Sequence, residues 1–326
     1  MLPNTGTSGV KPVAHGGDLG EVRRRFPDAP LPWIDLSTGI NPVPYPLPTL
    51  SPESWTRLPS RADQEALIEA AARRYGVGDP ETIVAAPGTQ ALIQLLPRLV
   101  PKSRVAIVGP TYEEHEVSWR RQGHDVSVVD RLPAQAGVVV LVNPDNPTGR
   151  LLSTAALGAV EGLLVVDEAF IDFHPDTASL AGKNAVVLRS FGKTYGLAGL
   201  RLGFAIAERS LAARMRDELG PWAVPGPAIE IGRLALSDDA WLRDTTQRVE
   251  ADSKRLDALL VQNGFDVLGG TFLVRLTRHP DAPRRVEALA RHGIHVRRFA
   301  REPSWLRFGL PGNDAEFSRL ARALSQ

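Results

Sequence analysis

Two short runs of the sequence, residues 138–142 and 163–166, contain only apolar residues. They lack the alternation of apolar and polar side chains that is found in half-exposed strands. Continuous apolar runs are typical of strands buried on both faces, which occur in parallel sheets covered by helices. Similar runs alternate with helical patterns between residues 65 and 207. The other strands predicted in this region are 104–108, 126–129, 185–189 and 203–207. Strands that alternate with helices predict an α/β domain with a mainly parallel sheet sandwiched by helices.

Two helices of this domain can be placed from the sequence. Residues 65–75 put Leu67 and Tyr75 on one helical stripe, and Gly76 supplies a stop. Residues 91–99 form the second predicted helix. Both helices therefore precede the apolar runs that form the centre of the predicted sheet.

The character of the sequence changes after residue 211, where long charged helical stretches replace the apolar runs. A helix is predicted over 240–262 and a closing helix over 314–324. Short strands are predicted at 265–268, 272–276, 294–298 and 306–310. These elements predict a smaller C-terminal α+β domain. The expected division is an N-terminal arm (1–40), a large domain (41–210) and a small domain (211–326).

The composition excludes several classes of function. The formal net charge is +1, which gives no indication of binding to nucleic acid or to an anionic membrane. The absence of cysteine excludes disulfides, thiolate metal sites and cysteine nucleophiles, and we expect no metal. The first twenty residues lack the apolar core of a signal peptide, and no apolar run is long enough to cross a bilayer. We therefore expect a soluble, cytoplasmic protein.

The segment Ser190-Phe-Gly-Lys193-Thr-Tyr-Gly-Leu-Ala-Gly-Leu-Arg201-Leu-Gly203 follows a predicted buried strand. Lys193 would then lie at the carboxyl edge of the sheet, where open α/β sheets bind their ligands. A lysine whose pKa is lowered by burial is a good amine nucleophile for a carbonyl group. The hydroxyl of Ser190 and the guanidinium of Arg201 both suit a phosphate.

Three other interpretations compete for Lys193. A nucleotide-binding P-loop ending at Thr194 would need glycine at position 187, where Val187 stands. The spacing Ser190-x-x-Lys193 also begins a serine acyl-transfer motif, but its partner motifs are absent from usable positions. The segment taken alone is also compatible with a lysine on a glycine-rich surface loop.

Polar residues follow other predicted strands and start one helix. Asp167 ends the run 163–166, where a carboxylate could pair with a protonated pyridine nitrogen or cap a helix. Asn146 follows the run 138–142 between two prolines, which could also mark a simple turn. Tyr112 follows the strand 104–108 and could stack on a flat cofactor or belong to the core.

The segment Gly88-Thr89-Gln90 precedes the predicted helix 91–99. The free N–H groups and the dipole at a helix start favour an anion such as phosphate. Together the strand ends and this helix start supply phosphate donors, an acid, an amide, an aromatic ring and an amine. A planar phosphorylated aldehyde cofactor would use all of them.

These motifs resemble those of the aspartate-aminotransferase-like pyridoxal-phosphate enzymes, and the resemblance runs from about residue 15 to 312. It implies pyridoxal 5'-phosphate as cofactor, with Lys193 forming the Schiff base and Asp167 paired with the pyridine nitrogen. It further implies that Asn146 bonds the ring hydroxyl and that Tyr112 stacks on the ring. The implied phosphate cup is Gly88, Thr89, Gln90, Ser190 and Arg201. Arg307, in the segment Trp-Leu-Arg-Phe-Gly, would clamp the substrate carboxylate.

The beginning of the chain suggests a branch of this family. The segments His15-Gly-Gly-Asp and Trp33-Ile-Asp-Leu-Ser-Thr-Gly-Ile-Asn41-Pro resemble the threonine-phosphate decarboxylases of cobalamin biosynthesis. This resemblance implies decarboxylation of L-threonine O-3-phosphate to 1-aminopropan-2-yl phosphate. The alternative is an aminotransferase of the histidinol-phosphate type. Which bond breaks depends on the orientation of the substrate, which the sequence leaves open.

The resemblance also indicates how the substrate binds. Asn41 would lie near the substrate, and His15 would reach it from the N-terminal arm. A substrate phosphate needs a second cationic pocket, for which Arg297 is preferred over Arg298 and Arg301 from its family position. Family active sites lie at a dimer interface, so the resemblance implies a homodimer.

Two positions depart from the family pattern. Phe170 stands where a tyrosine contact to the cofactor's ring hydroxyl is common. Leu58 stands where related enzymes carry a tyrosine that reaches across the dimer to the cofactor phosphate. Both weaken a generic aminotransferase interpretation, but neither removes a residue that cofactor binding requires.

Overall fold

The computed structural model of the chain describes residues 16–133 and 135–326. The strands are β1 (Ile34–Leu36), β2 (Ile83–Ala86), β3 (Arg104–Val108), β4 (Asp125–Val129), β5 (Gln135–Val142), β6 (Glu161–Asp167), β7 (Val186–Ser190), β8 (Gly203–Ile206), β9 (Asp266–Thr271), β10 (Val274–Arg278), β11 (Ile294–Arg298) and β12 (Trp305–Gly309). The helices are α1 (Gly20–Arg25), α2 (Glu53–Thr56), α3 (Arg61–Tyr75), α4 (Thr89–Leu99), α5 (Glu114–Arg121), α6 (Thr154–Gly158), α7 (Phe191–Thr194), α8 (Arg209–Leu219), α9 (Gly226–Leu236), α10 (Asp239–Gln262), α11 (Ala282–Arg291) and α12 (Asp314–Leu324). Three 3₁₀ turns are η1 (Pro80–Thr82), η2 (Ile171–Phe173) and η3 (Ala198–Leu200).

The larger sheet has the strand order β2-β8-β7-β6-β5-β3-β4 within the described residues. Strands β3 to β7 pair in parallel, while β8 runs antiparallel to both β2 and β7. The predicted mainly parallel sheet is confirmed. Because β2 shares the direction of the parallel strands, its carboxyl end and theirs lie at one edge, and β8 begins at the same edge. This edge collects the candidate site residues.

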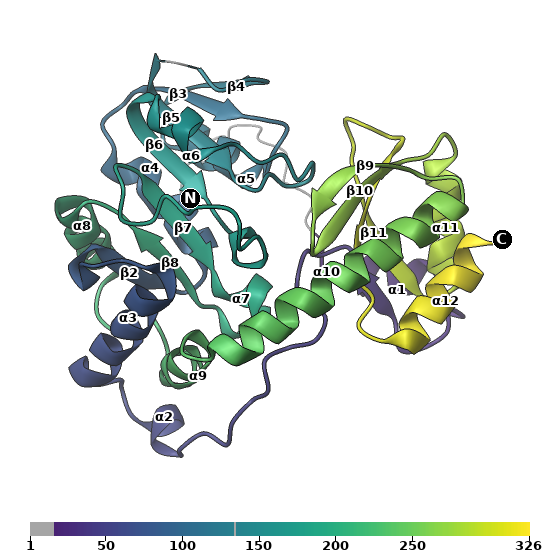
Figure 1. The fold of residues 1–326 in the computed structure, drawn as a ribbon, viewed down its shortest axis with the longest axis horizontal. Coiled ribbons are helices and arrows are strands. Elements are labelled where there is room, and N and C mark those ends of the chain that lie inside the picture. The colour runs from purple at the N-terminus through teal and green to yellow at the C-terminus, as the bar shows by residue number, and fades with distance from the viewer. Residues whose placement is uncertain (1–15, 134) are drawn as a thin grey trace, which may run out of the picture.

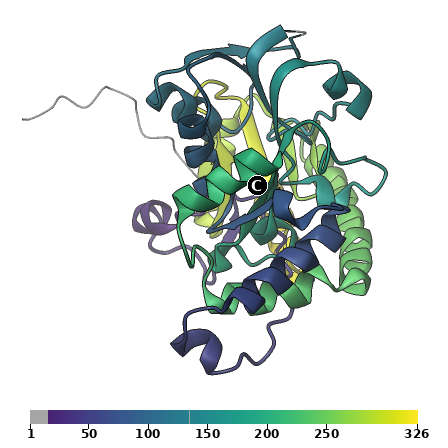
Figure 2. The same cartoon turned by 90° about the vertical axis from the view of Figure 1, so that its left-hand side faces the viewer.

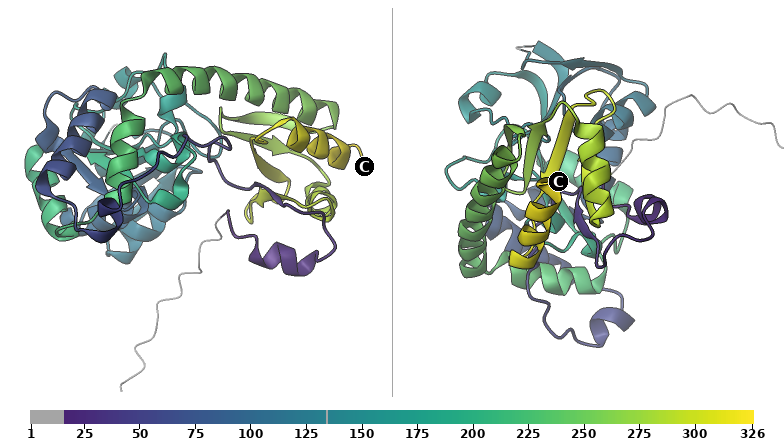
Figure 3. Two further views of the ribbon diagram at one scale, coloured as in Figure 1. Left: turned by 90° about the horizontal axis from the view of Figure 1, so that it is seen from below. Right: turned by 90° about the vertical axis from the view of Figure 1, so that its right-hand side faces the viewer.

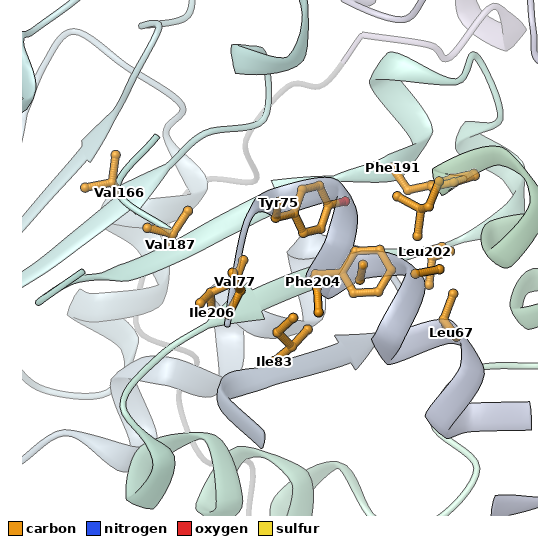
Figure 4. Packing of buried hydrophobic residues seen from close by; sticks show 14 of the residues in the cluster. Leu67, Tyr75, Val77, Ile83, Val166, Val187, Phe191, Leu202, Phe204 and Ile206 are labelled. Carbon is orange, nitrogen blue, oxygen red and sulfur yellow. The ribbon is translucent and has the colours of Figure 1, made fainter. Parts of the chain in front are cut away.

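Helices cover both faces of this sheet, as the continuous apolar runs predict. Val138 and Val140 of β5 pack with α4, α5 and α8, whereas Val139 and Leu141 pack with α3 and α9 on the other face. A strand residue points to the face opposite that of its neighbour, so burial on both faces requires apolar residues throughout. Figure 4 shows the α3 side, where Tyr75 meets the Phe204 ring edge-on at 5.6 Å.

The smaller sheet has the order β1-β11-β12-β10-β9 among the described strands. Its core contains buried residues from α10, α11 and α12. The N-terminal segment contributes β1, which pairs in parallel with β11. This segment is predicted as an arm from the sequence, because a strand of three residues is too short to show a periodic pattern.

Helix α10 connects the two lobes and is the longest diagonal element in Figure 1. Near its start, Trp241 stacks on Tyr195 of the large lobe at 5.4 Å, while Leu256 is buried in the core of the small lobe. Helices α8 and α9, which follow residue 208, still pack on the large sheet. The chain therefore passes into the small lobe within α10, and Figure 3 shows this helix spanning both lobes.

Helix α2 projects from the large lobe at the bottom of Figures 1 and 2. It packs against α9, where the backbone of Ser54 lies so close to Gly226 that a Cβ there would meet the Ser54 oxygen at 2.2 Å. Among the described residues, every helix is too short or too polar to traverse a lipid bilayer.

Candidate active site

Asp167 lies at the carboxyl end of β6 with both carboxylate oxygens bonded. Oδ1 accepts a hydrogen bond from the backbone N–H of Ala169 at 3.0 Å, and Oδ2 lies 3.2 Å from Nε2 of His115. Burial acts to raise the pKa of Asp167, but the bond from His115, the charge of Lys193 and the Ala169 N–H outweigh it. The pKa is therefore held below its ordinary value, and the group is a carboxylate that can pair with a cation.

His115 is a site residue that the sequence analysis missed. It lies in the first turn of α5, is buried, and places its ring edge-on to Tyr112 with the ring centroids 6.1 Å apart. The sequence carried one signal for it, a spacing of three residues from Tyr112 near a helix start, which puts both side chains on one side. The contact of His115 with Asp167 joins residues 52 positions apart and depends on the packing of α5 over the sheet.

Lys193 lies in the single turn α7 that directly follows β7. Among the described residues its Nζ forms no hydrogen bond or ion pair, and it lies 5.2 Å from the centre of the Phe170 ring. Burial lowers the pKa of Lys193, and the charges of Arg307 and Arg201 add to this, while Asp167 opposes it. A lowered pKa increases the neutral fraction of the amine, which is the form that attacks a carbonyl group.

The predicted phosphate cup is assembled from three separate segments. Gly88 precedes α4 with a φ of +84°, and a Cβ at this position would meet Nη2 of Arg201 at 2.6 Å. Gly203 is equally confined, because its Cβ would meet the backbone nitrogen of Thr89 at 2.5 Å. Gly203 pairs with Ser190 across β7 and β8. The helix start, the serine and the guanidinium therefore converge at one edge of the sheet, as a phosphate requires.

Gln90 uses its side chain to hold an aromatic ring. Its Oε1 accepts a hydrogen bond from the Tyr112 hydroxyl at 3.1 Å, and its Nε2 donates to Glu114 at 2.8 Å. Burial, followed by the charges of Glu114 and Asp167, raises the pKa of Tyr112 to about 12. Tyr112 therefore remains a phenol and keeps its bond to Gln90 at neutral pH. Nε2 carries two N–H donors and the backbone carries one, so a phosphate contact from Gln90 could use either group.

Arg307 on β12 connects the small lobe with the loop after β5. Its Nη1 donates to Oδ1 of Asn146 at 2.5 Å, and its Nη2 donates to the carbonyl oxygen of Ser37 at 2.6 Å. Its Nε is buried without a hydrogen-bond partner among the described residues. Burial and the nearby charge of Arg297 lower the pKa of Arg307 to about 10. A buried guanidinium with an unused N–H needs an acceptor, which a bound carboxylate can supply.

Of the three arginines considered for a substrate phosphate, Arg297 is the one that faces this region. It pairs with Arg307 across β11 and β12 and interacts electrostatically with Tyr112 and Glu113. Arg298 and Arg301 are both exposed. Burial lowers the pKa of Arg297, although Glu113 opposes this effect.

Asn41 lies beside the lysine turn and is buried. Its backbone N–H donates to the carbonyl of Lys193 at 2.9 Å, and its Nδ2 donates to the carbonyl of Thr194 at 3.0 Å. Its Oδ1 accepts a 2.7 Å hydrogen bond from Arg248 on α10. These contacts hold the lysine turn, while a direct contact with substrate stays a prediction. His15 lies outside the described residues.

The two departures from the family pattern have different surroundings. Phe170 is buried beneath Lys193 and packs so closely on Gly39 that a Cβ there would meet its ring at 2.9 Å. Leu58 has 67% of its surface exposed. The phenyl ring of Phe170 therefore provides an apolar wall next to the amine, and Leu58 makes little contact within its own chain.

A family model described as aminotransferase class I and II matches residues 33–324. The chain belongs to this family. Members of the aminotransferase class I and II family are pyridoxal-phosphate-dependent enzymes, and the predicted family resemblance is confirmed.

Two relatives within the family are similar over nearly their whole length. The chain is 43% identical to a threonine-phosphate decarboxylase from Sinorhizobium sp, with 97% of this chain and 98% of the relative covered. It is 41% identical to a threonine-phosphate decarboxylase from Pseudomonas aeruginosa, with 96% and 97% covered.

A solved structure shows the same fold. The histidinol-phosphate aminotransferase from Sinorhizobium meliloti, solved in complex with pyridoxal-5'-phosphate, superposes with a TM-score of 0.78. The match covers 98% of this chain and 97% of the other at 22% sequence identity. The predicted fold class is confirmed.

Proposed function

We propose that this protein is a threonine-phosphate decarboxylase that converts L-threonine O-3-phosphate to 1-aminopropan-2-yl phosphate and carbon dioxide in cobalamin biosynthesis. The observation that carries this proposal is the pair of arginines at 297 and 307. They are Cα partners on adjacent strands, and neither forms a salt bridge among the described residues. Two neighbouring cations that no salt bridge neutralises suit a substrate with two anionic groups, and Glu113 acts on Arg297 only through its charge. The identity to two threonine-phosphate decarboxylases supports the same substrate.

The donor set at the sheet edge fits pyridoxal 5'-phosphate. The phosphate would be held by Gly88, Thr89, Gln90, Ser190 and Arg201, and the ring by Tyr112, Asn146, Asp167 and Lys193. Gly88 supports this assignment, because its missing Cβ leaves open the space in front of the Arg201 guanidinium. When bound, the cofactor draws electrons away from the substrate α-carbon.

The residues of this chain select and complete the reaction. Arg307 would bind the substrate carboxylate and Arg297 the phosphate, so the substrate is held at both ends. This grip sets which bond of the α-carbon stands perpendicular to the cofactor plane, and that bond is the one that breaks. In the decarboxylase the bond to the carboxylate breaks, carbon dioxide leaves, and a proton replaces it on the α-carbon.

Lys193 and Asp167 have complementary roles in this scheme. Lys193 Nζ, whose pKa is lowered, can hold and deliver the proton at the α-carbon. Asp167, whose pKa is also lowered, stays a carboxylate and would keep the pyridine nitrogen protonated. His115 holds that carboxylate in position.

Incubation with L-threonine O-3-phosphate tests the proposal. We expect release of carbon dioxide and formation of 1-aminopropan-2-yl phosphate without any added keto acid. Transfer of the amino group to 2-oxoglutarate from histidinol phosphate, without carbon dioxide release, would instead identify an aminotransferase. Lys193→Ala should abolish both the activity and the visible absorption band of the lysine-bound cofactor.

A homodimer in the cytoplasm completes the proposal. Several large apolar side chains are exposed around α2 and before α9, namely Leu47, Trp55, Leu58 and Trp222, with 50% to 69% of their surfaces accessible. Exposed apolar clusters of this kind are typical of subunit interfaces. Light scattering coupled to gel filtration should give a particle of twice the monomer mass. In Trp55→Glu the measured mass should fall toward that of the monomer. Cell fractionation tests the location.

A further inference from the structure

The lysine turn α7 is held in place by contacts from distant parts of the chain. It comprises a single turn of four residues, and so short a helix has little stability of its own. Asn41 grips its backbone at the carbonyls of Lys193 and Thr194. A third contact comes from the side chain of the last residue of the turn. The Thr194 hydroxyl donates a 2.6 Å hydrogen bond to Oδ2 of Asp172. Thr194 is almost completely buried, so water does not replace this bond.

Asp172 in turn belongs to a buried ionic cluster that joins two strand ends. It accepts a hydrogen bond from Nη2 of Arg189, whose Nη1 lies 3.3 Å from Glu168. Glu168 directly follows Asp167 on β6, and Arg189 directly precedes Ser190 on β7. The cluster therefore ties the acid at the end of β6 to the lysine turn after β7.

The surroundings of Arg189 restrict its movement. Its guanidinium lies 4.4 Å from the centre of the Tyr75 ring on α3, and its side chain is 6% exposed. Glu168 is fixed from a further direction by the hydroxyl of Ser179 at 2.5 Å and the N–H of Leu180 at 2.8 Å. Arg189 is therefore held in one position, and it holds Asp172 next to the lysine turn.

We propose that Thr194 and Asp172 are positioning residues, which fix Lys193 relative to Asp167 through the Thr194 hydroxyl and the Arg189 anchor. This inference rests on the proposed role of Lys193 as the cofactor-bearing lysine. Burying an ion pair gains little stability over apolar packing of the same volume, and its value in this cluster is the geometry that it imposes. Lys193 belongs to this turn, so a displaced turn would move the base of its side chain and carry Nζ away from the geometry that the reaction needs.

A matched pair of substitutions at Thr194 tests the proposal. Thr194→Val keeps the shape of the side chain and removes the hydroxyl, whereas Thr194→Ser keeps the hydroxyl and removes a methyl group. The first measurement is the rate at which the visible absorption band grows when pyridoxal phosphate is added to cofactor-free protein. We expect Thr194→Val to slow this rate and to lower kcat by about tenfold each, with KM within about twofold. Thr194→Ser should stay within about twofold of the parent protein.

A second measurement needs no cofactor. Hydrogen exchange of the amides of residues 191–195 should be faster in Thr194→Val than in Thr194→Ser or the parent protein, because the turn loses its side-chain anchor. Asp172→Ala, which removes the acceptor of the Thr194 hydroxyl, should give the same pattern, and it replaces Thr194→Val if that variant does not fold.

The outcomes separate positioning from general stability. Equal band-formation rates and equal exchange in Thr194→Val and the parent protein would overturn the inference. So would equal impairment of Thr194→Val and Thr194→Ser, since the hydroxyl would then be irrelevant. A lowered melting temperature with unchanged kinetics would also overturn it. Failure of the proposed role of Lys193 shows differently, as a visible band that survives in Lys193→Ala. Failure of the proposed decarboxylation shows as no carbon dioxide from L-threonine O-3-phosphate, and the exchange measurement tests the turn in either case.

Discussion

Arg307 donates a 2.5 Å hydrogen bond from Nη1 to Oδ1 of Asn146, joining a strand of the small lobe to the loop after β5 in the large lobe. The same guanidinium donates from Nη2 to the carbonyl of Ser37. The planar fork of Arg307 therefore spans both lobes, and its Nε–H is buried without a hydrogen-bond partner among the described residues.

Replacing Arg307 by lysine keeps the charge but not the fork. We expect Arg307→Lys to raise KM for L-threonine O-3-phosphate by roughly thirtyfold, since a lost charge-assisted contact costs about 2 kcal/mol. Arg298→Lys, at an exposed arginine on the neighbouring strand, is the matched control and should leave KM unchanged. An unchanged KM in Arg307→Lys would contradict the assignment of Arg307 to the substrate.

Arg297 and Arg298 are adjacent in sequence, but only Arg297 faces the site. Arg297→Ala should lower kcat/KM for the phosphorylated substrate by roughly a hundredfold, as expected when a buried charge-assisted contact of about 3 kcal/mol is lost. Arg298→Ala should stay within about twofold. Steady-state kinetics with both variants checks this, and similar losses in the two would show that their effect is only through net charge.

His115 opposes the effect of burial on the pKa of Asp167, so removing His115 should raise that pKa. His115→Phe leaves the burial that raises the pKa of Asp167 and removes the hydrogen bond that lowers it. The carboxylate should then take up its proton at a higher pH and lose its pairing with the pyridine nitrogen there. Dissociation constants for pyridoxal phosphate should be measured between about pH 4 and 8. As the pH is lowered, the variant should lose affinity at a higher pH than the parent protein does. Coincident pH profiles would remove His115 from this role.

Gly88 needs both its positive φ and its missing side chain. In Gly88→Ala the backbone is strained by about 1–3 kcal/mol, and the new Cβ presses on the Arg201 guanidinium. We expect a lowered melting temperature and cofactor affinity reduced by at least about tenfold. Gly78→Ala is the matched control, because nothing lies within 4 Å of its Cβ position. Parent-like cofactor affinity in Gly88→Ala would place the phosphate elsewhere.

Much of the large domain follows from local features of the sequence. The strands at 138–142 and 163–166 were predicted because burial on both faces of a parallel sheet requires continuous apolar residues, and β5 and β6 contain them. Lys193, Asp167, Asn146 and Tyr112 could be named because each follows a predicted strand. Chain connectivity alone places such residues at the carboxyl edge of the sheet.

Contacts between distant segments were decided only by the tertiary structure. The bond of His115 to Asp167 spans 52 positions, that of Thr194 to Asp172 spans 22, and that of Arg307 to Asn146 spans 161. None of these leaves a periodic pattern in the sequence, because each depends on how helices and lobes pack. The sequence by itself determined which chemical groups lie at the sheet edge, and only packing decided which of them touch.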